Sequence, residues 1–586
     1  MTGDAAGRRA TLRRTRVVVA IVLAVLLLGA AGWVIGRGFL AKSELESLAA
    51  SAGRLEDAVQ ERDIAAVEAT VREIAAHAGT AAGLTSDPLW RATEVLPGIG
   101  ANTAAVRIVS AHARDLADDA LPVLELFRAH GDEADAGLDL AVLVDAQAPL
   151  ATLASSFTAA DAELSAIRVD ELLAPVADGV GTLAAVVADG AEVADGISSA
   201  ARIAPGMLGM DGTRHILLMM QNPAELRTGG GLSGSFALLT AEDGRLRLTE
   251  QVDSSTFRHR PEAIVPIPAS TTELYGDAVG RYVQNASMTA DFELTVDLAT
   301  AWWRTHSDIP VDAVVSIDPR VLASLLAVTG PVEMPGGAAL SADNLVKVML
   351  VDPYLTLSGA EQTRIQRAAT QAVFDRVLGG GFDLFAWATA LADPIEEGRV
   401  ALWSAHADEQ DVLADSAVAG PLARHRAAGD DAYAVYFNDM TQGKMDSFLD
   451  VAITAGAARC RTDGRRDVAV TVTLTSLAPT EARTFPVLMT GASQAGIAPG
   501  DIATLVTVAA PAGADVGGVW DGDRTVLSTN VEDNGFPSTA AKITVAPGQT
   551  KNLQFRFTSA GDGDPVILHT PLLRDATVDA EEPACR

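Results

Sequence analysis

The pattern of hydrophobic and polar residues changes along the 586-residue chain. Over residues 43–205, apolar side chains recur at helical spacing, for example at Leu45 and Leu48, which predicts an all-α helical bundle or stalk. Over residues 210–455, strand-like runs such as RHILLMM and SGSFALLTA alternate with helical runs, which predicts a layered α/β/α central domain. Over residues 460–586, short β-type runs such as DVAVTVTLTS and IATLVTVAA are separated by turns, a pattern typical of a β-sandwich.

The most hydrophobic stretch, Val17 to Ile35, contains no charged residue. As a helix it spans roughly 28 Å at about 1.5 Å per residue, which predicts one transmembrane crossing. A cleaved signal peptide is the alternative, but this run is longer than the usual apolar region of about 7–15 residues. The excess of positive charge before the run predicts that residues 1–16 are a cytoplasmic basic tail and that most of the chain is extracytoplasmic. The arginines that supply this charge are Arg8, Arg9, Arg13, Arg14 and Arg16.

The rest of the chain is strongly acidic, because the total net charge is −32 even with these arginines included. Binding to nucleic acid depends on an excess of Lys and Arg over the contact surface. We therefore expect no nucleic-acid partner. The charge instead favours a solvated extracytoplasmic protein attached to the lipid bilayer through residues 17–35.

Two cysteines, Cys460 and Cys585, lie in the last quarter of the chain. In an oxidising compartment they are candidates for one disulfide, and two cysteines alone cannot form a metal site. We expect no resident metal or other cofactor.

A glycine-rich segment, QNPAELRTGGGLSGSF at residues 221–236, contains the pattern G-x-G-x-x-G at Gly229, Gly231 and Gly234. A dinucleotide site needs a helix after these glycines, whereas a strand-like run follows them here. The phosphate-binding loop of nucleotide hydrolases is also excluded, since no Lys-Ser/Thr pair follows. A serine nucleophile at Ser233 would likewise need a second glycine two residues later and a helix after it.

The first half of this segment is typical of a capped turn. Asn222, Pro223 and Glu225 fit the N-cap, first and third positions of a short helical turn, and Gly229 fits its exit. Two interpretations of Glu225 and Arg227 remain open. They form a capping group and an ion pair that fix the loop, or Arg227 contacts a ligand.

Several longer segments resemble the domain-of-unknown-function 4012 family of bacterial membrane-anchored proteins. They are HILLMMQNPAELRTGGGLSGSFALLTAEDGRL, VDAVVSIDPRVLASLLAVTGPVEMPGG, NDMTQGKMDSFLD and LPGIGANTAAVR. The resemblance implies a membrane-anchored envelope protein, but it implies no activity because the family has none assigned.

The order of elements more distantly resembles the LytR-CpsA-Psr domain, whose members transfer undecaprenyl-linked glycopolymers to the cell wall. That family has an Arg-x-x-Arg helix facing the lipid diphosphate, and Arg364 and Arg367 stand at the similar position here. Guanidinium groups suit a diphosphate because each offers two parallel hydrogen bonds. The other charged motifs of that family are replaced by Leu232 to Ser235 and by Val252 to Ser255. Most of the charges that hold magnesium and diphosphate in that family are therefore missing here.

Three nearby residues are candidates to replace the missing charges under this resemblance. Asp253 is the candidate ligand of a magnesium ion, and Arg258 and Arg260 lie just beyond it. Alternatively, Arg364 and Arg367 belong to a solvated helix face together with Glu361.

Two functional hypotheses follow. In the first, the chain is a non-catalytic envelope protein that binds or organises an envelope polysaccharide, a polyprenyl-linked lipid or another membrane protein. In the second, it is a divergent transferase or hydrolase of polyprenyl-diphosphate-linked glycans, in which Arg227, Arg364 and Arg367 hold the diphosphate and Asp253 holds Mg²⁺. The second hypothesis requires these four residues to converge on one cavity, and the sequence leaves open whether the chain is an enzyme.

Overall fold

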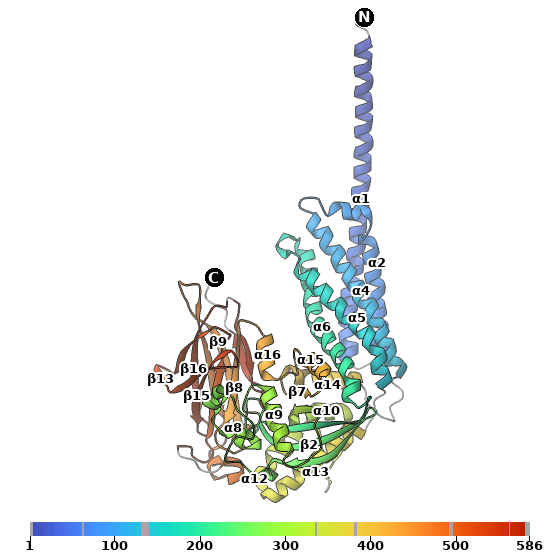
Figure 1. The fold of residues 1–586 in the computed structure, drawn as a ribbon. Helices are drawn as coiled ribbons and strands as arrows, with labels where there is room; N and C mark the ends of the chain where they lie inside the picture. The colour runs from blue at the N-terminus through green and yellow to red at the C-terminus, as the bar shows by residue number, and fades with distance from the viewer. Residues whose placement is uncertain are drawn as a thin grey trace. The chain divides into compact units, whose positions relative to one another are not determined.

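The computed structural model describes residues 4–60, 64–130, 140–334, 337–379, 384–491, 496–561 and 563–580 (Figure 1). Side chains are described from Val25 onward, with a few further gaps. The chain folds into two compact units that divide at about Pro205, and each is described by itself. Helices make up the first unit, and the second combines several sheets with helices, which confirms the predicted mixed α/β chain with a helical N-terminal region.

The first unit is an assembly of long helices whose apolar stripes face one another. Leu55 packs against Val67 and Val71 in one cluster, and Leu164 packs against Val187 in another. The helices are α1 (Asp4–Gln60), α2 (Ile64–Thr85), α3 (Pro88–Thr93), α4 (Gly100–His130), α5 (Leu140–Ser165) and α6 (Ala174–Met207).

Among the described residues, α5 is a helix long and apolar enough to cross a membrane. Its Ala146 and Leu150 are buried against Val123 and Ala201, however, so part of its apolar surface serves the helical core. The predicted span at residues 17–35 lies within α1, but the side chains of residues 17–24 and 27 lie outside the described residues. Membrane attachment through that segment remains a prediction.

The second unit contains a mixed five-stranded sheet in the order β3-β2-β1-β4-β7, in which only β1 and β4 run parallel. Strand β1 is apolar on both faces because both faces are covered. Leu217 and Met219 enter one core, while Leu218 and Met220 enter the other. The strands are β1 (Arg214–Asn222), β2 (Leu232–Glu242), β3 (Arg245–Asp253), β4 (Ala313–Ile317) and β7 (Ala401–Ser404).

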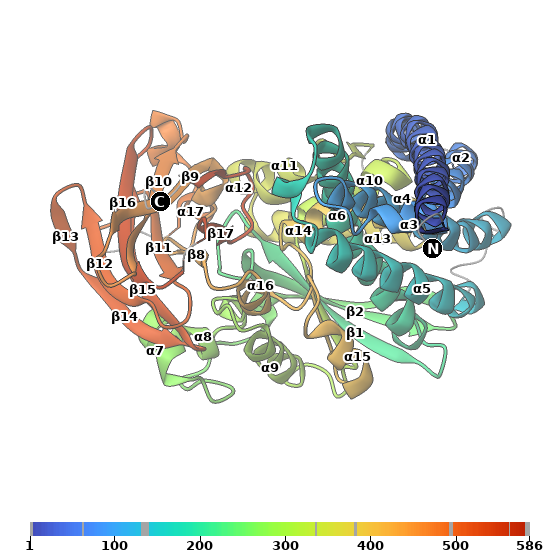
Figure 2. The ribbon, with the colours of Figure 1, turned by 90° about the horizontal axis from the view of Figure 1, so that it is seen from above.

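Helices cover both faces of this sheet (Figure 2). Trp302 and Trp303 are fully buried in the core of the first face, and Leu322, Val373 and Phe374 are buried in the core of the second. The first face carries α7 (Ala269–Tyr275), α8 (Ala278–Arg281), the short helix η3 (Val283–Asn285) and α9 (Phe292–Trp303). The second carries α10 (Pro319–Thr329), α11 (Leu345–Leu350), α13 (Gly359–Gly379) and α14 (Leu384–Glu396), with α12 (Asp352–Thr356) alongside.

A β-sandwich completes the second unit, with sheets ordered β13-β12-β16-β10-β9-β18 and β14-β15-β11-β8-β17. It begins earlier than the predicted residue 460, because β8 and β9 already belong to its two sheets. The run AYAVYFND is buried along its whole length, as β11 is, and it lies within the range predicted for the α/β domain. The strands are β8 (Ala432–Asp439), β9 (Leu449–Cys460), β10 (Arg466–Ser476), β11 (Ile502–Ala509), β12 (Asp515–Asp521), β13 (Arg524–Val526), β14 (Ser528–Asp533), β15 (Phe536–Val545), β16 (Thr550–Ser559), β17 (Val566–His569) and β18 (Thr577–Ala580).

The C-terminal segment connects the sandwich to the α/β sheet. Between β17 and β18, Leu572 enters the sandwich core and its carbonyl accepts a 2.6 Å hydrogen bond from Arg399. Arg399 also pairs with Asp318 at 2.7 Å, at the start of α10. The predicted disulfide between Cys460 and Cys585 stays a prediction, because the Cys460 side chain and Cys585 lie outside the described residues.

Candidate functional site

The glycine-rich segment connects β1 to β2 and is almost entirely buried. The Asn222 side chain accepts a 3.1 Å hydrogen bond from the backbone N–H of Ala224, and the Glu225 N–H donates to the Asn222 carbonyl at 3.0 Å. The chain therefore turns at Pro223. The Glu225 carboxylate does not reach back to the turn as a capping group would, because it forms ion pairs elsewhere.

The glycines allow close approach of the backbone at this turn. A Cβ on Gly231 would lie 2.4 Å from the Asn222 carbonyl carbon, a distance that no real side chain tolerates. Gly229 donates its N–H to the Ser287 carbonyl at 2.9 Å, and a Cβ there would meet Ser287 at 3.2 Å. Gly234 has ordinary space around it, with the nearest atom at 3.7 Å. The pattern G-x-G-x-x-G thus serves packing at its first two glycines.

A buried ion cluster joins the glycine-rich segment to the β8–β9 connection. This connection consists of residues 440–448, between the end of β8 and the start of β9. Glu225 pairs with Arg227 at 3.0 Å and with Lys444, and all three side chains are at most 9% exposed. Arg227 also donates to the side chain of Asn285 at 3.1 Å. Arg227 is therefore held on several sides within the protein.

Hydrogen bonds from the end of β8 strengthen the contact between the glycine-rich segment and the β8–β9 connection, which we call the joint. The amide of Asn438 accepts from the Thr228 N–H at 3.2 Å and donates to the Thr228 hydroxyl at 2.9 Å. Asp439 donates its own N–H to the Leu226 carbonyl at 2.9 Å, and its carboxylate accepts from Thr441. The motifs QNPAELRTGGG and NDMTQGKMD are thus two halves of one structural contact.

Electrostatics in the joint differ from one carboxyl to the next. Burial raises the pKa of Glu225, but the positive charges of Lys444 and Arg227 outweigh burial and the net shift is downward. Burial and the negative charge of Glu225 raise the pKa of Asp439 to about 6. Burial and the charge of Asp439 raise the pKa of Asp446 well above its usual value. Glu225 is therefore the ionised partner of the two cations.

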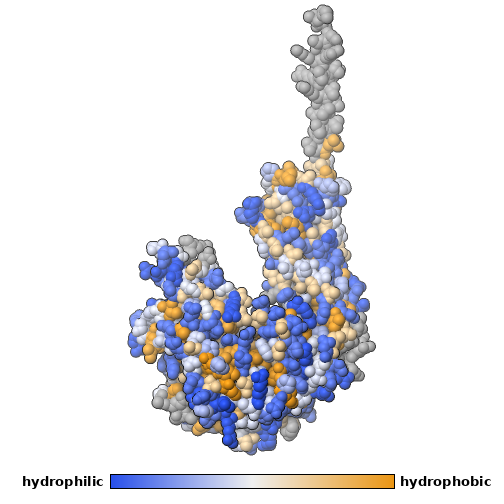
Figure 3. Space-filling model, in the orientation of Figure 1, coloured by the Kyte–Doolittle hydropathy of each residue, from blue (hydrophilic) through white to orange (hydrophobic). Residues whose placement is uncertain are grey.

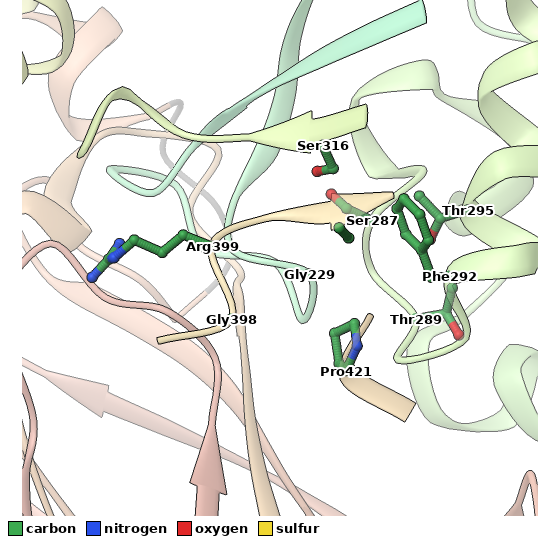
Figure 4. Close-up of a pocket in the computed structure, with 10 residues that line it drawn as sticks. Gly229, Ser287, Thr289, Phe292, Thr295, Ser316, Gly398, Arg399 and Pro421 are labelled. Atoms are coloured by element: carbon green, nitrogen blue, oxygen red, sulfur yellow. The ribbon is translucent and has the colours of Figure 1, made fainter. Parts of the chain in front are cut away.

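A small pocket lies beside the segment, with a volume of about 10 Å³. Figure 4 shows Ser287, Ser316 and Gly229 around it and the side chain of Arg399 directed away from it. Its remaining lining residues are Thr289, Phe292, Thr295, Gly398, Ala401 and Pro421. The Gln221 side chain donates to Ser316 at 2.9 Å and accepts from Ser287 at 3.1 Å, and both serines line the pocket. A cavity of this size has room for about one water molecule, too little for a sugar or a diphosphate.

The residues predicted to bind a diphosphate are not brought together. Arg227 is buried and contacts η3, whose Val283 belongs to the core of the first sheet face. Arg364 and Arg367 are exposed on α13, which covers the second face. Arg258 and Arg260 are exposed as well.

Asp253, the proposed magnesium ligand, accepts a 2.8 Å hydrogen bond from the Ser255 N–H and so caps a short helical turn. Within the described part of the chain, no group of three or more His, Cys, Asp or Glu side chains is placed to hold a metal ion.

The sequence did not identify Lys444, Asp439 and Asp446 as partners of the glycine-rich segment. Their segment, NDMTQGKMDSFLD, contributed only to the family resemblance. The one available signal was a cluster of polar and charged residues at and just after the end of a strand-like run, and this signal does not indicate which distant residues they contact.

Comparison with known proteins gives a family but no activity. Residues 211–354 match the model of a family described as a protein of unknown function, DUF4012. A search of curated proteins found no match. The X-ray structure of the Lin1025 protein from Listeria innocua is similar at 14% identity and a TM-score of 0.22, over 34% of this chain and 76% of that one. The matched segment includes β1, the glycine-rich segment and β2, and residues 211–354 of this chain therefore belong to the DUF4012 family.

Proposed function

We propose that this protein is a membrane-anchored, extracytoplasmic protein of the bacterial cell envelope with a non-catalytic role in binding or organising envelope polysaccharide. One observation carries the non-catalytic part of the proposal. The charged groups of the family motif are used inside the protein, where Glu225, Arg227 and Lys444 neutralise one another.

A catalytic or ligand-binding group has to reach its substrate. The Arg227 side chain is only 5% exposed and donates to Glu225, Asn285 and the Leu226 carbonyl. Releasing it to a diphosphate would leave Glu225 with one cation in a buried site, which is energetically costly. The motif therefore supports a structural function for the loop, which fixes the α/β sheet against the sandwich.

The proposed location rests on the N-terminal sequence. The uncharged run from Val17 to Ile35, preceded by five arginines, supports one membrane crossing with the acidic body outside the cytoplasm. An acidic, multidomain extracytoplasmic body suits contact with envelope polymers, polyprenyl-linked lipids or other membrane proteins.

The test compares turnover with binding. The full chain, purified in detergent, is incubated with polyprenyl-diphosphate-linked glycan and Mg²⁺, and both product formation and bound glycan are measured. We expect bound glycan or polyprenyl lipid to co-purify, with no turnover. Turnover that is abolished by Arg364→Ala and Arg367→Ala would overturn the proposal in favour of a transferase or hydrolase. Both arginines are exposed, so these variants are expected to fold.

The location is tested by a cysteine-accessibility experiment. A cysteine introduced at an exposed position such as Val193 should react with a membrane-impermeant maleimide in intact cells, after Cys460 and Cys585 are replaced by serine. Labelling only after the cells are opened would contradict the proposed topology.

A further inference from the structure

One end of the helical unit carries an unusual group of exposed apolar side chains. The connection from α3 to α4 places Val95 at 83% exposure, and the connection from α5 to α6 places Leu173 at 63%. Figure 3 shows hydrophobic residues at the end of this unit from which α1 emerges. We call this group the apolar tip, and its members are Leu89, Val95, Leu96, Ile99, Val169 and Leu173.

Specific contacts hold the two connections of the apolar tip together. The Asn102 side chain, at the start of α4, accepts a 2.8 Å hydrogen bond from the Leu173 N–H. Glu94 pairs with Arg107 at 2.7 Å. The buried indole of Trp90 donates to the Thr103 carbonyl at 2.9 Å. The apolar side chains thus project from a braced surface.

The apolar tip is also fixed to α1. Arg37 pairs with Asp87 at 2.6 Å and donates to the Leu84 carbonyl at 2.9 Å. Gly38 lies beside the Trp90 ring, which a Cβ on this glycine would approach to 3.8 Å. Asp87 also caps α3, since its carboxylate accepts from the N–H groups of Leu89 and Trp90.

These contacts place the apolar tip at the end of the predicted membrane span. The predicted span ends at Ile35, two residues before Arg37, which is about 3 Å along a helix at roughly 1.5 Å per residue. Trp33 is half exposed there and stacks against Arg37, and Phe39 and Leu40 are exposed just beyond. Tryptophan at the end of a span is typical of the lipid–water interface. A group of exposed apolar side chains gathered at one end of a folded unit is typical of a binding surface.

We propose that the apolar tip inserts into the interfacial region of the same bilayer that α1 crosses, so that the helical unit rests on the membrane surface. The occupant of this surface is lipid, because the contact between Arg37 and Asp87 holds the apolar tip beside the end of the predicted span. This inference rests on the membrane anchor in the proposed function. The insertion is shallow and involves side chains of two connections, with α1 supplying the anchor.

The test uses the full chain in vesicles of phosphatidylcholine and phosphatidylglycerol. Cys460 and Cys585 are replaced by serine, and a single cysteine at Leu96 is labelled with an environment-sensitive fluorophore. Doxyl-labelled phosphatidylcholine is expected to remove most of its fluorescence. A matched probe at Val193, which is exposed roughly 28 Å along α6 from Ala174 at about 1.5 Å per residue, should keep its fluorescence.

A second variant tests whether the apolar side chains are responsible. With the probe moved to Leu173, the double substitution Val95→Asp and Ile99→Asp should abolish quenching by lipid while the chain still floats with the vesicles. Both side chains are exposed, so the helical circular dichroism signal should not change. Quenching that survives this substitution would refute the role of these two residues.

The outcomes separate the tip from the anchor. A chain that fails to float with vesicles after an alkaline carbonate wash overturns the anchor and the tip together. A chain that floats but leaves the Leu96 probe unquenched by lipid overturns the tip alone. If that probe is also shielded from iodide in water, a second copy of the chain covers the surface in place of lipid.

Discussion

The backbone N–H of Leu226 donates to the Asp446 carboxyl oxygen Oδ2 at 2.8 Å, although 220 residues separate them along the chain. The other carboxyl oxygen of Asp446 is buried and has no hydrogen-bond partner among the described residues. The β8–β9 connection therefore holds the glycine-rich segment through a carboxyl group whose raised pKa favours its protonated form. This arrangement makes the joint sensitive to pH and to substitution.

The pH dependence of the joint should oppose that of ordinary surface carboxylates. Because the pKa of Asp439 is raised to about 6, the folded chain binds more protons than the unfolded chain between about pH 4 and pH 6. The same sign holds for Asp446, whose pKa is also raised. The contribution of both groups to stability is therefore fully present at low pH and is lost as the pH rises through the folded-state pKa.

We expect Asp446→Asn to gain thermal stability relative to the parent chain as the pH rises from about 4 to about 7. Asparagine keeps an acceptor for the Leu226 N–H and removes the ionisable group. Asp446→Ala should instead cost about 1–3 kcal/mol at every pH, since the buried N–H then has no acceptor. Melting temperatures across this pH range check both variants. A difference between Asp446→Asn and the parent that does not change with pH would contradict the assignment.

Lys444→Met should destabilise the second unit strongly. It leaves the buried Glu225 carboxylate with Arg227 alone, and breaking a buried pair typically costs about 3–5 kcal/mol. Arg524→Met is the matched control, because Arg524 is 82% exposed in its pair with Asp521 and should change stability by less than about 1 kcal/mol. Urea unfolding followed by tryptophan fluorescence measures the free energy of unfolding of both variants. If Lys444→Met lowers it no more than Arg524→Met does, the buried pair is not needed for stability.

The glycine pattern can be dissected by two alanine substitutions three residues apart. Gly231→Ala should cost about 1–3 kcal/mol or prevent folding, because its Cβ would meet the Asn222 backbone. Gly234→Ala should be tolerated, since its nearest neighbour lies at 3.7 Å. Soluble yield and melting temperature are the measurements. If Gly234→Ala proves the more harmful of the two, the pattern has a role other than packing.

The sequence predicted what depends on local periodicity. The helical N-terminal region and the strands RHILLMM and SGSFALLTA follow from the spacing of apolar residues. The rejection of a nucleotide site also came from local order, because β2 follows the glycines directly. Such features need only neighbouring residues to be recognised.

The features that the sequence did not predict depend on contacts between distant residues. Strand β8 is buried throughout, and its own residues do not show that it pairs with the distant β11 and so belongs to the sandwich. Arg227 was open to two interpretations because an ion pair with Glu225 and a ligand contact need the same residue types. Two partners that lie far away in the sequence hold it inside the protein: Asn285 accepts its hydrogen bond, and Lys444 pairs with the same Glu225 carboxylate.

Arg399 provides the last prediction, because it joins α10 to the C-terminal segment. Its guanidinium pairs with Asp318 at 2.7 Å, donates to the Leu572 carbonyl at 2.6 Å, and also contacts Glu397. Arg399→Met should leave the Asp318 carboxylate without its buried counter-ion and lower stability by about 3–5 kcal/mol. The C-terminal segment should also detach more readily, so limited proteolysis is expected to cut after Arg574 sooner than in the parent chain.

Arg320→Met is the control. Arg320 donates to the Leu573 carbonyl at 3.2 Å and pairs with the exposed Asp575 at 2.7 Å, and the loss of this partly solvated contact should cost less stability. Faster cleavage in Arg320→Met than in Arg399→Met would mean that the exposed pair, and not the buried one, holds the C-terminal segment in place.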